Sequence, residues 1–141
     1  MRPFEFEHGA LPGSLELAYL GDTIYDLYVR ARLVCAGGHV RQMHREAVKI
    51  VCAQAQARAF RRIEDQLTDR EREVARRARN AHQSPTRNAN PAEYHLATAL
   101  EALTGYLFVT GQQARMEALL VRLMRENDAP QEQFARLGLK M

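Results

Sequence analysis

Apolar residues recur at steps of three and four along this 141-residue chain, and no segment alternates convincingly with a period of two. The first such segment follows Pro12-Gly13, with Ser14 as its expected N-cap, and ends at Gly37-Gly38. Its predicted buried stripe consists of Leu17, Leu20, Ile24, Leu27, Ala31 and Val34. A chain dominated by this period is predicted to fold as packed helices.

Local start and stop signals divide the rest of the chain into further helices. Thr68 and Glu71 fit a capping box, and Asn90-Pro91 combines a good N-cap with a proline at the first helical position. The expected helices cover residues 40–63, 68–81, 90–111 and 113–126, and residues 83–91 are the clearest loop. The sequence predicts an all-α fold of about five to seven helices in a single domain over residues 1–141.

Charge is distributed unevenly, although the net charge is only +3. Residues 1–26 hold five acidic residues and one base, whereas residues 74–92 hold no acidic residue. The basic segment contains Arg76, Arg77, Arg79, His82 and Arg87. An acidic end and a basic segment in one small domain suggest a polyanion held near a cation site. The alternative is that the arginines at 76–79 complement the dipole of a helix end.

The two cysteines and the hydropathy pattern indicate where in the cell the protein is found. Cys35 and Cys52 have no metal-ligand spacing and fall on apolar helical stretches, so we expect buried thiols in a reducing compartment. Glu5 and Glu7 stand where a signal peptide needs an apolar segment. No apolar run reaches the roughly 18 residues of a membrane span. We therefore expect a cytoplasmic protein without membrane association.

Two carboxylates stand alone in apolar surroundings. Asp22 follows Leu20-Gly21, and Glu101 precedes Ala102-Leu103, each inside an apolar helical run. A carboxylate on such a surface is costly unless a partner pairs with it. If helix packing joins the two, they form a site for a hard cation such as Mg²⁺. The plainer alternative is that both are solvated.

The same two segments resemble the signatures of a known family. The run from Leu17 to Tyr25 resembles the first signature of the ribonuclease III catalytic domain, and the run from Glu101 to Leu107 resembles the second. Finer features are similar to the Mini-ribonuclease III branch, which consists of the catalytic domain without a double-stranded-RNA-binding domain. These features are Ala18, the run 25–30, Arg79-Asn80-Ala81, Tyr94 and Thr98, and the resemblance covers about residues 14–126.

The resemblance implies an Mg²⁺-dependent endoribonuclease, with Mn²⁺ as a substitute, that cleaves double-stranded RNA and matures ribosomal RNA precursors of the large subunit. It implies Asp22 and Glu101 as catalytic residues and metal ligands, and a homodimer that makes staggered cuts. A ribosomal protein that presents the substrate is a further partner to consider. The candidate RNA contacts are Arg77, Arg79, Asn80, His82, Arg87 and Asn88.

The chain departs from the wider family at three carboxylate positions. Leu15, Ala18 and Thr98 stand where most ribonuclease III enzymes have acidic residues, so one or two metal ions per site are both open. These losses resemble the Mini-III branch and leave nuclease activity as the favoured interpretation. Two alternatives stay open at this point: a non-catalytic RNA-binding or ribosome-assembly module, and a plain helical dimerisation protein. The RNA that is cut and its cleavage site are not specified.

Overall fold

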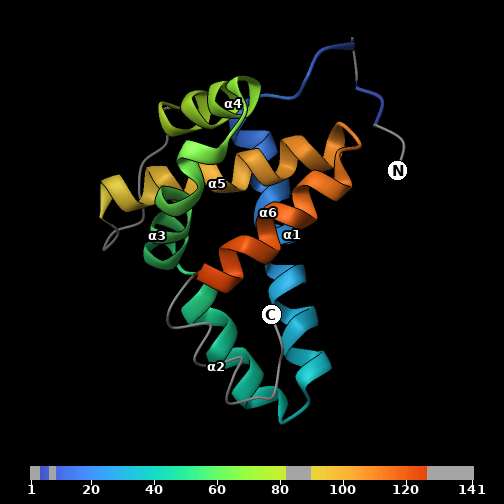
Figure 1. The fold of residues 1–141 in the computed structure, drawn as a ribbon, viewed down its shortest axis with the longest axis vertical. Helices are drawn as coiled ribbons and strands as arrows, with labels where there is room; N and C mark the ends of the chain where they lie inside the picture. Colours follow the sequence, from blue (N-terminus) through green and yellow to red (C-terminus); the bar gives the residue numbers. More distant parts are fainter. Residues whose placement is uncertain (1–3, 7–8, 82–89, 127–141) are drawn as a thin grey trace.

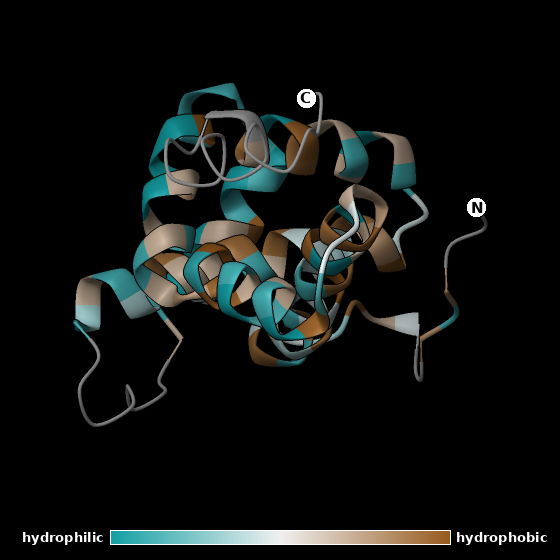
Figure 2. Cartoon of the chain, turned by 90° about the horizontal axis from the view of Figure 1, so that it is seen from below, coloured by the Kyte–Doolittle hydropathy of each residue, from teal (hydrophilic) through white to brown (hydrophobic). Residues whose placement is uncertain are grey.

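The computed structural model describes residues 4–6, 9–81 and 90–126, and within them it confirms the all-α prediction (Figure 1). Six α-helices and one short 3₁₀ helix follow one another along the described chain. They are α1 (Ser14–Ala36), α2 (Val40–Val51), α3 (Ala53–Ile63), η2 (Glu64–Gln66), α4 (Asp69–Arg79), α5 (Pro91–Val109) and α6 (Gln113–Glu126). Figure 2 shows hydrophobic and hydrophilic residues alternating along several of these helices, as amphipathic helices require.

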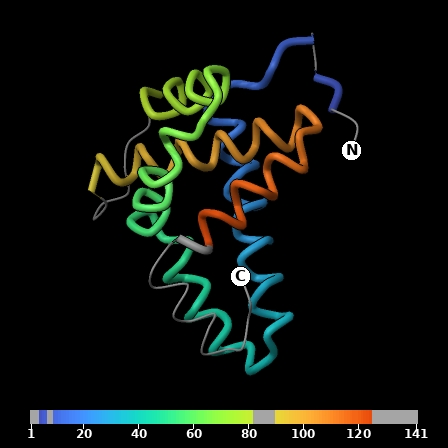
Figure 3. The backbone as a smooth tube through the Cα atoms, in the orientation of Figure 1, coloured from blue at the N-terminus to red at the C-terminus, as the bar shows by residue number. Residues whose placement is uncertain are grey.

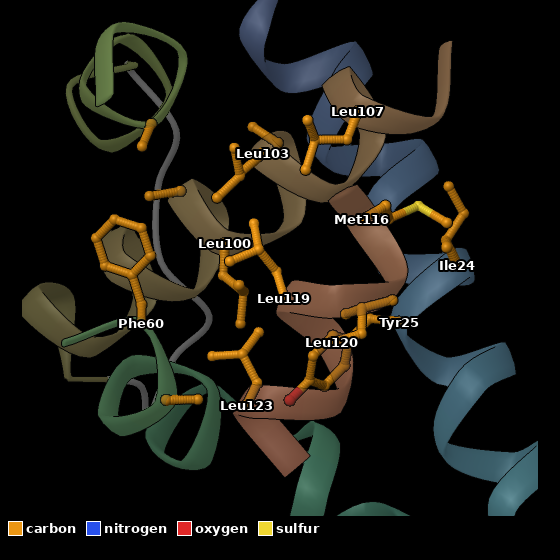
Figure 4. Close-up of a cluster of buried hydrophobic side chains, with 14 of the residues drawn as sticks. Ile24, Tyr25, Phe60, Leu100, Leu103, Leu107, Met116, Leu119, Leu120 and Leu123 are labelled. Carbon is orange, nitrogen blue, oxygen red and sulfur yellow. The ribbon is translucent and has the colours of Figure 1, made fainter. Parts of the chain in front are cut away.

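Helix α5 is the centre of the fold, and α1, α3, α4 and α6 all pack against it. It is buried nearly all round from Leu96 to Val109, as expected for a helix that is apolar on every side. Figure 4 shows leucines of α5 and α6 gathered with Ile24 and Phe60 in one cluster. Because four of the other five α-helices in the described residues contact α5, the position of a residue on α5 determines which helix lies next to it.

Helix α1 turns a different face to the core from the one its periodicity predicts. Leu17 and Ile24 are buried as expected, but Ala31 is exposed, and Leu27 and Val34 are 61% and 63% exposed. The buried face instead contains Leu17, Ala18, Gly21, Ile24, Tyr25, Val29 and Leu33. This face carries the small residues that let α1 approach α5 closely, so packing selected it over the more apolar alternative. Gly13, not Ser14, occupies the N-cap position.

The predicted helix 40–63 is wrong as a single helix, because the chain breaks at Cys52. Cys52 has φ −67° and ψ 155°, and it is both the C-cap of α2 and the N-cap of α3. No glycine or proline announces this break. The bend lets α2 contact α1 while α3 contacts α5, as the trace in Figure 3 shows. The prediction of buried thiols is also wrong, since Cys35 and Cys52 are exposed.

The start of α4 is tied to α6 through one buried carboxylate. Thr68 and Glu71 form the predicted capping box, in which the Glu71 amide donates to Thr68 Oγ1 and the Thr68 amide donates to Glu71 Oε1. Arg115 of α6 donates to both Glu71 oxygens at 3.0 Å. Burial raises the pKa of Glu71, but its bonds from Arg115 and Thr68 outweigh burial and leave that pKa below its usual value.

Among the helices of the described residues, none is both long and apolar enough to cross a membrane.

Glu71→Gln should destabilise the fold by about 1–3 kcal/mol at pH 7, because it removes a buried charge-assisted pair. A carboxyl with a lowered folded-state pKa stabilises the fold above its unfolded pKa, and that contribution is lost as the pH falls through the folded value. The difference between parent and variant should therefore shrink below about pH 4. Urea unfolding at several pH values measures it.

Glu73→Gln is the control for this prediction, because Glu73 lies in the same helix but pairs with the exposed Arg76 and Arg77. Exposed pairs contribute little to stability. An equal loss of stability in both variants, or a Glu71→Gln effect that does not change with pH, would contradict the assigned role of Glu71.

Candidate active site

Two glycines let α1 and α5 cross with their backbones in contact. A Cβ atom built on Gly21 would collide with the backbone carbonyl of Glu101, and one built on Gly105 would collide with the carbonyl of Leu17. Neither collision involves a flexible side-chain end that can move aside. The glycines are therefore required here for space, and the crossing sets the spacing between residues next to them on the two helices.

The crossing brings the two predicted acidic residues together. Asp22 follows Gly21 directly and is exposed, while Glu101 lies one turn before Gly105 and is half-buried. Both line one pocket of about 340 Å³. Its other linings include Leu15, Ala18 and Tyr19 from α1, Gln56 from α3, and Tyr94 and Thr98 from α5. Asp22 and Glu101, which are far apart in sequence, thus share a small, partly apolar pocket.

The environment of Glu101 is unfavourable for its negative charge. Burial and the neighbouring Asp22 carboxylate, which is in hydrogen-bonding range, together raise the pKa of Glu101 to about 9. Burial is the larger cause, since it removes water from the charged form. This environment therefore disfavours the charged form of Glu101 unless a cation compensates the negative charge.

The donor set fits a divalent cation with few protein ligands. Carboxylate oxygens are hard donors, and Mg²⁺ is usually bound through one or two of them while it keeps several waters. Within the described ranges, no group of three or more His, Cys, Asp or Glu side chains is placed to hold a metal ion. Asp22 and Glu101 are therefore suited to one ion, and its binding there stays a prediction.

The three departures from the wider family line this same pocket. Leu15 and Ala18 add apolar wall, and Thr98 adds a hydroxyl. That hydroxyl is already engaged, because Thr98 Oγ1 donates to the Tyr94 carbonyl at 3.0 Å. The extra carboxylates that the resemblance leads one to expect thus have apolar or satisfied counterparts here.

The predicted RNA contacts lie elsewhere on the surface. Arg77, Arg79 and Asn80 are exposed at the end of α4, and none of them lines the pocket of Asp22 and Glu101. Arg77 pairs with Glu73 at 2.9 Å, and Arg79 lies 3.9 Å from Glu64. Their role in binding RNA stays a prediction. The other predicted contacts, His82, Arg87 and Asn88, lie outside the described residues.

Sequence reasoning missed one pocket residue altogether. Gln56 is 2% exposed on α3 and lines the pocket beside the two carboxylates. No signal in the sequence separates Gln56 from Gln54, which stands in the same alanine-rich run but is exposed.

Comparison with known proteins points to one family. Residues 15–112 match the profile of the Ribonuclease III domain. The chain is 45% identical over 109 residues to the Mini-ribonuclease 3 of Symbiobacterium thermophilum, covering 75% of this chain and 83% of that protein. It is 37% identical over 114 residues to the Mini-ribonuclease 3 of Streptococcus pneumoniae, covering 78% and 89%.

A solved structure has a similar fold. The crystal structure of a protein from Fusobacterium nucleatum superposes with a TM-score of 0.75 at 26% sequence identity. The match covers 80% of this chain and 88% of that protein. The sequence comparisons therefore give the family, and the structural comparison shows that its fold is shared with a solved protein.

Gly21→Ala should destabilise the protein and lower cleavage of RNA together. The added methyl group meets the Glu101 carbonyl, and overpacking of this kind costs about 1–3 kcal/mol, more than the gain of about 1 kcal/mol in helix propensity. Thermal unfolding and a cleavage assay measure the two effects. Gly13→Ala is the matched control, because its Cβ meets only the movable Glu16 carboxyl group. A Gly21→Ala protein as stable and active as the parent would refute the close crossing.

Proposed function

This chain belongs to the ribonuclease III family and is an endoribonuclease of the Mini-ribonuclease 3 type, and from that premise we propose that Asp22 and Glu101 form its Mg²⁺-dependent catalytic site for double-stranded RNA. The convergence of the two carboxylates in one pocket at the Gly21–Gly105 crossing carries this proposal. Residues 1–141 act as a single catalytic domain in this proposal.

Hydrolysis of a phosphodiester needs an activated water, in-line attack and stabilisation of the developing charge. A bound Mg²⁺, or Mn²⁺ in its place, supplies charge stabilisation and activates water. Asp22, which is exposed, and Glu101, which is half-buried, would hold this ion. Leu15 and Ala18 add apolar wall to the pocket, and the partial burial of Glu101 strengthens electrostatic interactions on that side.

Among the described residues that line the pocket there is no cysteine or histidine to favour a covalent mechanism. The exposed Cys35 and Cys52 are not among the residues that line the carboxylate pocket. Retention of both carboxylates in a Mini-ribonuclease 3 chain also argues against the non-catalytic alternatives. We assign the substrate within its class to precursors of large-subunit ribosomal RNA and the site of action to the cytoplasm, as the family resemblance implies. A ribosomal protein that presents this RNA is part of the same proposal.

We also propose that the active form is a homodimer. Tyr19, Leu27 and Val34 are 85%, 61% and 63% exposed and recur along one side of α1, so three large apolar side chains on this face are left uncovered in the single chain. A two-fold axis through this face would give two sites, one for each RNA strand. Sedimentation at micromolar concentration should show a dimer, and Leu27→Glu should shift it toward the 16.1 kDa monomer. A parent protein that stays monomeric would refute the dimer.

Asp22→Asn should reduce cleavage of duplex RNA by at least about 100-fold, because the amide keeps the shape but loses the charge that holds the cation. The parent should gain thermal stability when Mg²⁺ is added, since an ion that binds only the folded state stabilises it. The variant should lose that gain while its circular dichroism stays unchanged. Cleavage at the parental rate by Asp22→Asn would show that the assignment is wrong.

Replacement of Arg77, Arg79 and Arg87 by alanine should weaken duplex RNA binding and flatten its salt dependence. Each lost phosphate contact removes about 0.9 from the slope of log affinity against log salt concentration. The competing role at the helix end is worth at most about 1 kcal/mol per residue. Binding at several salt concentrations, together with the melting temperature, separates the roles. An unchanged slope with a lower melting temperature would show that these arginines serve the fold.

A further inference from the structure

Gln56 is a buried polar residue whose amide nitrogen is left without a partner. The residue is 2% exposed, and its Nε2 atom is fully enclosed with no hydrogen-bond partner in the described part of the chain. Most buried polar groups in folded proteins are paired, because an unpaired donor loses its bonds to water and gains nothing in return. An alanine or leucine at this position would avoid that cost, so the glutamine calls for an explanation other than stability.

The location of Gln56 in the pocket supplies such an explanation. The break at Cys52 starts α3 at Ala53, and the Gln56 amide of the main chain donates to the Cys52 carbonyl at 3.0 Å. Gln56 is therefore in the first turn of α3, on the wall of the pocket that Asp22 and Glu101 line. Nε2 is enclosed in the present side-chain conformation, but rotation about the terminal bond of a glutamine is broad and roughly two-fold, so a turn of the amide group presents the donor to the pocket.

The chemistry of the unpaired atom limits its possible partners. An N–H donor does not coordinate a cation, so Nε2 is unsuited to be a third metal ligand. The partner it lacks is an acceptor oxygen. Non-bridging oxygens of a phosphodiester are charged acceptors, and hydrogen bonds to charged oxygens are stronger than those between neutral groups.

We propose that Gln56 is a substrate-positioning residue whose Nε2 donates a hydrogen bond to a non-bridging oxygen of the RNA phosphodiester held beside Asp22 and Glu101. This rests on the proposed function of that pocket. The bond holds the phosphate in the orientation required for in-line attack, and it forms only when RNA is present. The enzyme thus keeps an unpaired donor in its RNA-free state because the bound phosphate satisfies it.

Gln56→Met tests the proposal, because methionine keeps the length and approximate volume of glutamine but has no donor. The melting temperature should stay the same or rise, since an unpaired buried group is removed. The stabilisation by added Mg²⁺ should match that of the parent. The single-turnover rate of duplex RNA cleavage at saturating enzyme should fall about 10- to 100-fold, as expected for loss of one bond to a charged group.

Glu46→Gln is the matched control. Glu46 Oε2 is the other buried side-chain atom without a partner among the described residues, and Glu46 lies on α2, outside the pocket. This variant changes a similar buried group away from the RNA, so it should cut at the parental rate. A loss of cleavage as large as that of Gln56→Met would show that the effect comes from general disturbance of the fold.

A sulfur substitution identifies the oxygen. An RNA duplex is made with one phosphorothioate, in each diastereomer, at the bond that the parent cuts, and it is assayed with Mg²⁺ and with Mn²⁺. Sulfur accepts a hydrogen bond poorly, so one diastereomer should slow the parent in both metals and should slow Gln56→Met much less. A loss that Mn²⁺ restores would instead mark an oxygen bound by the metal.

The outcomes separate this proposal from the function on which it rests. Parental cleavage by Gln56→Met, or equal sulfur effects in the two proteins, would overturn the phosphate contact. Loss of the Mg²⁺ stabilisation in Gln56→Met would also overturn it, because Gln56 would then act through the metal ligands. Failure of the carboxylate site itself would appear as full activity in Asp22→Asn, a result that does not involve Gln56.

Discussion

The backbone contact between α1 and α5 at Gly21 and Gly105 is the constraint on which the rest of the molecule depends. It selects the face of α1 that is buried, because only the side with Ala18 and Gly21 has side chains small enough for the two backbones to touch. That choice leaves Tyr19 and Leu27 uncovered and places Asp22 beside Glu101. The dimer surface that we propose and the active site are therefore two consequences of one close packing.

The pocket itself is built from locally unfavourable elements. A half-buried Glu101 has a neighbouring carboxylate, and a buried Gln56 has a donor without a partner. Neither would be chosen for stability alone, and proteins commonly accept such costs where they bind ligands. In this proposal the cation compensates the negative charge at Glu101, and an RNA phosphate accepts the hydrogen bond that Gln56 otherwise lacks. The surrounding fold compensates with the apolar core of α5 and α6 and with the Glu71–Arg115 pair.

The two acidic residues of the pocket and the arginines predicted to bind RNA lie in different parts of the structure. The pocket holds the carboxylates and an amide, while the arginines at the end of α4 lie outside its lining. In our proposal the first group handles one phosphodiester and the second holds the flanking duplex, which is recognised mainly by shape and phosphates. At two positions where most ribonuclease III enzymes have acidic residues, Leu15 and Ala18 form an apolar part of the pocket wall.

Sequence alone determined the features that depend on near neighbours in the chain. The capping box at Thr68 and Glu71, the N-cap at Asn90 and the all-α class follow from local hydrogen bonding and periodicity. The family signatures also singled out Asp22 and Glu101. Tertiary structure decided the break at Cys52, the exposure of Leu27 and the burial of Gln56. These depend on which helix faces meet, and an apolar period admits more than one face until contact between backbones selects it.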